Sequence, residues 1–375
     1  MDTSLWTDLP RPRAGADSPA PTTRRTLSAR GLRYFLGVIS SAAGAVARRI
    51  APFLAVAAVA GMTLSADPVQ PGQAPAVRLA DADNPLGGMP FYVDPASAAM
   101  VAARNANPPS AELTAVANTP QAYWIDQAFP AGTVTGVVGR YTGAAQAAGA
   151  MPVLTLYAIP HRDCGSFAAG GFGSGEAYRQ WIDAVAAGLG TSPAAIILEP
   201  DALAMADCLS PDQRQERFDL IHYAVDTLTR DPAAAVYVDG GHSRWLSAEE
   251  MAARLNQAGV GRARGFSLNT TNYYTTDEEI GYGEAISELT NGAHYVIDTS
   301  RNGVGPAPDQ ELNWCNPDGR ALGTPPTTAT GGAHADAYLW VKRVGESDGS
   351  CGRGEPAAGR FVSQYAIDLA RNAGH

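Results

Sequence analysis

Carboxylates stand where the apolar runs of this sequence end. The clearest case is the run 194–198, which stops at Glu199 and Asp201, two carboxylates separated by Pro200. Charged groups at the end of a buried strand need a reason, because burying an unpaired charge is costly. Paired carboxyl groups suit acid–base hydrolysis, and glycosidic bonds above all: one carboxylic acid protonates the leaving oxygen while a second group activates water or attacks directly.

Asp201 is the candidate general acid. Such an acid must hold its proton near neutral pH, so its pKa has to be raised by burial or by a nearby negative charge. Asp163, which follows the preceding apolar run, is placed to supply that charge. For a single carboxylate the structural alternative is a helix cap or a loop hydrogen bond. We assign a structural role of that kind to Glu199.

Apolar runs alternate with amphipathic segments, which predicts parallel strands joined by helices. The expected strands are residues 121–125, 152–157, 194–198, 235–238, 265–268, 294–297 and 337–341. The expected helices include residues 176–188, 213–228, 248–258 and 278–289.

Seven such strands predict an α/β fold with a distorted, seven-stranded parallel barrel of the TIM type. The competing arrangement is an open, doubly wound sheet. Its nucleotide-binding turn is poorly matched by GGFGSGE at 170–176, which follows a polar loop rather than a strand. Polar residues follow every expected strand, and a barrel gathers such residues at one rim. This clustering favours the barrel.

The composition excludes several classes of partner and cofactor. A formal net charge of −10 argues against nucleic acid and against anionic membranes as partners of the folded part. The histidines are too scattered for a metal site and no phosphate-binding loop is present, so we expect no metal and no cofactor. Four cysteines allow three disulfide pairings, with a structural zinc as the alternative, although CxxC spacing is absent. They are Cys164, Cys208, Cys315 and Cys351.

Residues 1–83 differ in composition from the rest of the chain. We expect a disordered leader, with an uncharged apolar stretch at 50–66 that suits an export signal or a short membrane anchor, and a proline-containing linker at 67–83. The catalytic domain is expected at 84–375. The protein is therefore predicted to be secreted or anchored at the cell surface, with membrane contact only through the apolar stretch.

Several motifs resemble those of glycoside hydrolase family 6, the inverting cellulases. In chain order they are PHRDCG at 160–165, ILEPDALA at 197–204, YVDGGHSRW at 237–245, NTTNY at 269–273, IDTSRNGVGP at 297–306, NWCNPDGRALGTPPT at 313–327 and LWVKRVGESDG at 339–349. The likeness runs from about residue 84 to the C-terminus. It implies a distorted seven-stranded barrel that cleaves β-1,4-glucan with inversion. We expect the enzyme to be a monomer.

The resemblance also implies a role for individual residues. Asp201 falls on the general acid, Asp163 on the aspartate that raises its pKa, Asp348 on the debated base, and Tyr157 on the tyrosine that crowds the distorted sugar. Positions lining the sugar sites are Trp124, Asp239, His242, Trp245, Asn272, Trp314, Lys342 and Glu346. Arg162 and Arg301 would hold the carboxylates by charge-assisted bonds. The implied disulfides are Cys164–Cys208 and Cys315–Cys351.

The sequence departs from the family pattern at two places. Ala169 stands where the family commonly has a serine that helps to hold the catalytic water. Only Gly349 and Ser350 separate Asp348 from Cys351, which is too short a link to cover a tunnel, so an open cleft and internal cleavage are expected. We therefore expect an endo-β-1,4-glucanase. The alternative is a weakly active or inactive glucan-binding surface protein.

Overall fold

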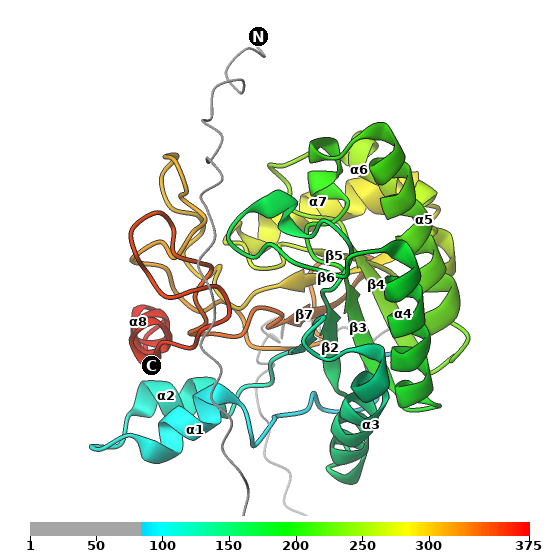
Figure 1. Cartoon of the computed structure of the whole chain (residues 1–375). Coiled ribbons are helices and arrows are strands. Elements are labelled where there is room, and N and C mark those ends of the chain that lie inside the picture. Colours follow the sequence, from blue (N-terminus) through cyan, green and yellow to red (C-terminus); the bar gives the residue numbers. More distant parts are fainter. Residues whose placement is uncertain (1–83) are drawn as a thin grey trace, which may run out of the picture. The chain divides into compact units, whose positions relative to one another are not determined.

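The computed structural model describes residues 84–375, and the expected leader, apolar stretch and linker lie outside these residues. Its centre is a sheet of seven parallel strands in the order β1 to β7 (Figure 1). The strands are β1 Tyr123–Ile125, β2 Val153–Leu156, β3 Ala194–Leu198, β4 Ala234–Asp239, β5 Gly265–Leu268, β6 His294–Asp298 and β7 Ala335–Leu339. Each overlaps the strand expected there, and the predicted α/β barrel class is confirmed.

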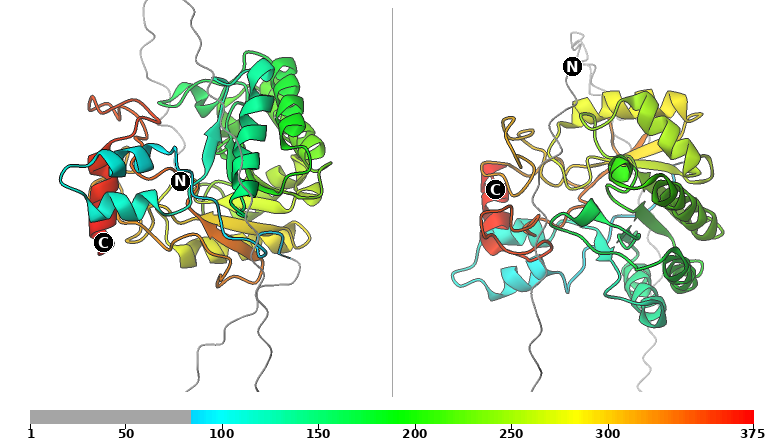
Figure 2. Two further views of the ribbon diagram at one scale, coloured as in Figure 1. Left: turned by 90° about the horizontal axis from the view of Figure 1, so that it is seen from below. Right: turned by 45° about the horizontal axis from the view of Figure 1, so that its top comes forward.

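Helices α3 to α7 pack on the outer face of this sheet, while α1, α2 and α8 lie on the opposite side (Figure 2). The helices are α1 Ala98–Asn105, α2 Ala111–Ala117, α3 Ala131–Ala147, α4 Gly175–Leu189, α5 Pro211–Leu228, α6 Ala248–Gln257, α7 Thr276–Leu289 and α8 Ser363–Asn372. Three short 3₁₀ helices lie at Asp163–Gly165, Ala204–Cys208 and Val260–Arg262. None of the described helices is long and apolar enough to cross a membrane.

Alternation along the strands separates two cores. In β3, Ala195 and Ile197 belong to the cluster inside the barrel, whereas Ile196 and Leu198 belong to the cluster beneath the outer helices. Both faces are buried, as in parallel sheets covered by helices. At the ends of β3 and β4 stand the buried carboxylates Glu199 and Asp239, which bond to the backbone of the loops there.

The barrel is incomplete between its first and last strands. No strand pairing joins β1 to β7 within the described residues. The gap is bridged instead by a hydrogen bond from the Ala122 N–H to the Trp340 carbonyl (3.0 Å) and by one from Trp124 Nε1 to the Val341 carbonyl (2.8 Å). We call this gap the seam. It is the distortion that a seven-stranded barrel was expected to have.

Candidate active site

Three buried carboxylates at strand ends hold the loops that carry the site. Glu199 accepts from the amides of Ala158 and Ile159 beyond β2, at 3.0–3.1 Å. Asp239 accepts from the amide of Asp201, and Asp298 accepts from the amides of Thr271 and Lys342 (all at 2.9–3.0 Å). Each carboxylate therefore ties the end of its own strand to the loop beyond a neighbouring strand.

The backbone at these strand ends lies in the left-handed region. Glu199 has φ +52° and Asp201 has φ +66°, and beyond β5 the same alternation recurs at Asn269 (+62°) and Thr271 (+64°). Residues other than glycine adopt this region at a cost in free energy, so they stay there only where contacts with the surrounding structure hold the backbone in place. The carboxylate-to-amide bonds provide that constraint.

Asp201 stands among negative charges. Burial raises the pKa of Asp201 well above its ordinary value, and the charges of Asp239 and Asp163 raise it further, while Lys342 partly opposes them. Burial also raises the pKa of Asp163, although its Oδ2 accepts from the Ala168 amide (2.6 Å). Asp201 is thus arranged to keep its proton.

Asp348 has the opposite environment. Burial alone would raise its pKa, but the Arg301 guanidinium and the Lys342 ammonium hold the pKa at about 2. Arg301 Nη1 donates to both carboxylate oxygens at 2.8–2.9 Å, Lys342 Nζ lies 3.0 Å from Oδ1, and the Asn316 amide donates to Oδ2 at 3.0 Å. Asp348 is consequently a fixed anion.

Two adjoining cavities meet at these carboxylates, since Asp163, Asp201, Thr271 and Trp314 line both. The first cavity also has among its walls Trp124, Tyr157, Arg162, Ala169, Lys342, Glu346 and Asp348. The second has His242, Trp245 and Asn272. Together they form one cleft that contains every residue expected to catalyse and nearly all those expected to bind substrate.

Asp239 is not placed as the sequence suggested. It lines neither cavity and is only 1% exposed. Its oxygens accept from the amides of Asp201 and Gly241 and from the Ser267 hydroxyl. The prediction that Asp239 lines a sugar site is therefore wrong, because its side chain points beneath the loop that carries Asp201.

Arg162 also departs from the expectation. It donates to the carbonyls of Tyr157 (2.6 Å) and Ala168 (2.9 Å) and to Gln127, and the carboxylate with which it forms an ion pair is Asp126, at 3.8 Å. It thus braces the loop after β2 instead of bonding to Asp163 or Asp201. Arg301 does bond to its expected carboxylate, Asp348.

Some cleft residues were not recognised in the sequence. Phe167 lies 6.0 Å from Trp314, ring centroid to centroid, and it packs on Gly349, where an added Cβ would come within 2.4 Å of the Phe167 Cβ. Tyr274 stacks on His242, with centroids 4.3 Å apart. The only available signal was proximity to the PHRDCG and NTTNY motifs.

Both disulfides brace loops that carry carboxylates of the cleft. Cys164 pairs with Cys208 and Cys315 pairs with Cys351, which is the pairing that the resemblance implies. The first anchors the residue next to Asp163, and the second closes the loop just beyond Asp348. Among the described residues no group of three or more His, Cys, Asp or Glu side chains could hold a metal ion.

A parallel α/β barrel whose rim carries a proton-holding carboxyl, a permanent carboxylate and aromatic side chains defines a glycoside hydrolase of the acid–base type. The family model for glycosyl hydrolases family 6 matches residues 86–373, and the chain belongs to that family. The order of the sequence motifs and the observed fold therefore both agree with membership of this family.

Curated relatives and solved structures fall in the same family. Endoglucanase A of Cellulomonas fimi is 46% identical over 76% of this chain, and Endoglucanase 1 of Streptomyces halstedii is 41% identical over 82% of it and 95% of its own length. The chain spans about three-fifths of the length of the first of these. The endoglucanase Cel6 of Mycobacterium tuberculosis, solved with methyl-cellobiosyl-4-deoxy-4-thio-β-D-cellobioside, is 84% identical over 78% of this chain and 100% of that one, with a TM-score of 0.78.

Proposed function

We propose that the protein is an endo-β-1,4-glucanase that hydrolyses internal bonds of cellulose or a related β-glucan with inversion. The observation that carries the proposal is the contrast between two carboxyl groups in one cavity. Asp201 is held in its protonated form by burial and negative neighbours, whereas Asp348 is held as an anion by Arg301 and Lys342. A pair of titratable groups pushed apart in this way identifies an acid and its partner.

In the proposed reaction Asp201 gives its proton to the glycosidic oxygen as the bond from that oxygen to C1 breaks. Water attacks C1 from the other face of the sugar, and the anomeric configuration inverts. The attacking water becomes strongly acidic as it bonds to C1, so a weak base suffices to take its proton. We assign that step, directly or through a second water, to Asp348, whose charge also stabilises the positive charge that develops on the ring.

The remaining cleft residues would bind and orient the chain. Trp314 is 39% exposed, which leaves a ring face free to stack on a sugar, and Trp124 and Trp245 offer further aromatic surface. Tyr157 would crowd the distorted ring beside Asp201. The polar side chains assigned to sugar hydroxyls are His242, Asn272, Lys342 and Glu346.

The short link between Asp348 and Cys351 supports internal cleavage, because it supplies no covering chain. The relatives named as endoglucanases agree with this. We further propose that the catalytic domain, residues 84–375, acts as a monomer and is exported, since two disulfides are typical of oxidising compartments. The apolar stretch 50–66 would then serve as signal or anchor.

Reducing-sugar release from a soluble cellulose derivative tests the proposal. The wild type should release sugar, Asp201→Asn should not, and Asp212→Asn, an exposed carboxylate on α5, should match the wild type. The first product should be the α-anomer by NMR. If the wild type binds the polymer but releases no sugar, the enzyme hypothesis fails and the glucan-binding alternative takes its place.

A further inference from the structure

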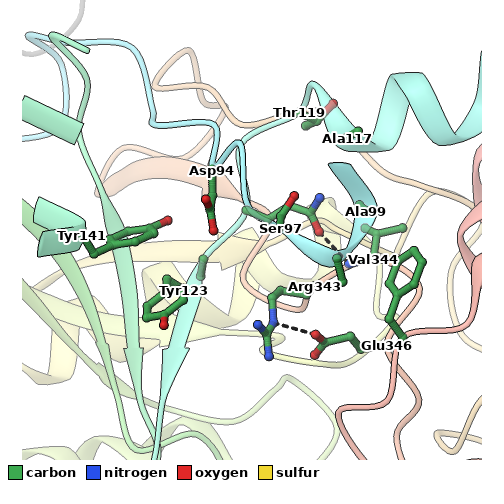
Figure 3. Close-up of a pocket in the computed structure, with 14 residues that line it drawn as sticks. Asp94, Ser97, Ala99, Ala117, Thr119, Tyr123, Tyr141, Arg343, Val344 and Glu346 are labelled. Atoms are coloured by element: carbon green, nitrogen blue, oxygen red, sulfur yellow. Dashed lines mark hydrogen bonds and ion pairs between the residues drawn. The ribbon is translucent and has the colours of Figure 1, made fainter. Parts of the chain in front are cut away.

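A small chamber of about 30 Å³ opens at the seam of the barrel, between β1, the start of α1 and the loop after β7 (Figure 3). Its walls include Asp94, Tyr123, Tyr141, Arg343 and Glu346. The chamber exists because β1 and β7 do not pair, so their edges diverge beyond the bridging bond from Ala122 to Trp340.

The chamber adjoins the catalytic cleft. Tyr123, Arg343 and Glu346 line both the chamber and the cavity that contains Asp201 and Asp348. At this junction Arg343 Nε lies 2.9 Å from Glu346 Oε1, and Figure 3 shows the pair beside Tyr123. Glu346 is nearly buried, and this ion pair fixes the Arg343 guanidinium at the border between the two spaces.

Two polar atoms in the chamber wall make no hydrogen bond within residues 84–375: Arg343 Nε, which is held by its ion pair with Glu346, and the Tyr141 hydroxyl. The Tyr141 hydroxyl is buried without a hydrogen bond to any of residues 84–375, and in Figure 3 it points toward Asp94. The Tyr141 ring is fixed by stacking on Tyr123, with centroids 4.4 Å apart. By contrast, the side-chain oxygens of Ser97, Thr119 and Gln121 are used by nearby backbone groups. A buried hydroxyl without a partner costs free energy unless a ligand or water satisfies it.

We propose that the chamber is an additional sugar-binding subsite of the cleft, in which a glucose unit lies between Tyr123 and Arg343 and places its hydroxymethyl group in the chamber. The subsite rests on the proposed function, because it extends the same glucan chain beyond the catalytic carboxylates. The Tyr141 hydroxyl bonds to the hydroxymethyl oxygen, and Arg343 donates to ring hydroxyls. Glu346, besides its proposed contact with sugar hydroxyls in the neighbouring cleft, positions Arg343 through their ion pair.

The size and charge of the chamber select this occupant. About 30 Å³ holds a water molecule or one small substituent, so a whole sugar ring stays outside, at the junction. Asp94 and Glu346 disfavour an anionic group. A hydroxymethyl group both donates and accepts, and therefore satisfies the Tyr141 hydroxyl without placing a charge in the chamber.

Tyr141→Phe is the decisive variant because it removes only the partnerless hydroxyl. Binding is measured by calorimetry in an Asp201→Asn background, so that the result does not depend on turnover. Across cellotriose to cellohexaose, Kd should rise about fivefold for the chains long enough to reach the junction, the worth of one hydrogen bond, and stay unchanged for shorter chains. The thermal midpoint should be unchanged or higher, since no internal bond is lost.

Tyr365→Phe on α8, which lines neither cavity, is the matched control. Arg343→Ala should weaken binding of the same long chains by a larger factor. An oligosaccharide whose terminal glucose is replaced by xylose lacks the hydroxymethyl group there and should be insensitive to Tyr141→Phe. An unchanged Kd at every length, or an equal loss at every length, would overturn the subsite while leaving the hydrolysis assay to judge the proposed function separately.

Discussion

The backbone N–H of Asp201 donates a hydrogen bond to Oδ1 of Asp239, 3.0 Å away. The same carboxylate accepts from the Gly241 amide and the Ser267 hydroxyl, so both its oxygens are committed within the protein. Asp239 thereby fixes the strained turn that presents the Asp201 carboxyl, and its charge is one of those that raise the pKa of that carboxyl. One buried residue thus controls both the position and the protonation of the proposed acid.

Asp239→Asn should impair catalysis in a pH-dependent way. Losing the negative charge of Asp239 lowers the pKa of Asp201, so Asp201 loses its proton at lower pH. The alkaline limb of the plot of kcat against pH therefore shifts to lower pH. The altered turn should reduce kcat on the order of 100-fold at the optimum. Ser267→Ala keeps the charge and removes one bond, so it should leave the alkaline limb in place. An unmoved limb in Asp239→Asn would show that the charge plays no part.

Asp201→Asn should discriminate between leaving groups. A natural glucan needs a proton on its leaving oxygen, so kcat/KM for cellotetraose should fall by about 10²–10⁴-fold. A dinitrophenyl cello-oligosaccharide releases a stable phenolate that needs no proton, and its cleavage should fall far less. Steady-state kinetics of the two substrates give the comparison, and equal losses on both would mean that Asp201 does not act as the acid.

Arg301→Gln should destabilise the protein and alter its response to acid. Because the folded-state pKa of Asp348 is about 2 and its ordinary value is 3.8, Asp348 contributes stability above pH 3.8 that is lost as the pH falls toward 2, about 2 kcal/mol in all. Without Arg301 the folded-state pKa rises toward 3.8, so the stability lost on acidification becomes smaller, and it changes sign once burial carries the pKa above 3.8. Removing one partner of a buried pair should also cost roughly 3–5 kcal/mol at neutral pH.

Urea unfolding between pH 2 and 7 measures both effects of Arg301→Gln. Arg353→Gln, an exposed arginine whose partner Glu355 is also on the surface, serves as the control and should change the free energy of unfolding by less than about 1 kcal/mol. The same acid dependence in wild type and Arg301→Gln would contradict the assignment of Asp348 as an anion held by Arg301.

Ala169→Ser should raise kcat about fivefold, the worth of one added hydrogen bond to the attacking water, with KM little changed. Ala169 lines the catalytic cavity and is exposed, so a hydroxyl fits there without disturbing the core. Ala144→Ser, at an exposed position of α3 away from the loop that carries Ala169, is the matched control. If neither substitution changes kcat, the water is positioned without help from this loop.

Much of the fold could be predicted because a buried strand is visible in its local sequence as a run of apolar residues. Runs of four to six residues in the sequence place the ends of every strand to within two residues, and those of β3 and β5 to the residue. Helix α3 was not recognised, since Gly132, Gly136, Gly139 and Gly143 weaken the helical propensity of its sequence and its stability comes from packing on α4. Tertiary contact here outweighs local preference.

The sequence by itself determined which residue types end each strand, and from them a cleft with Asp201 as its proposed acid could be expected, while the family resemblance pointed to Asp348 as the base. Only the tertiary structure decided which of these groups face the cleft. Asp239 and Arg162 bond to loops, Phe167 packs on Gly349, and the open seam brings Tyr141 beside Arg343. The reason is physical: strand periodicity arises between neighbouring residues, whereas a side chain's partner depends on loops that come together only when the barrel forms.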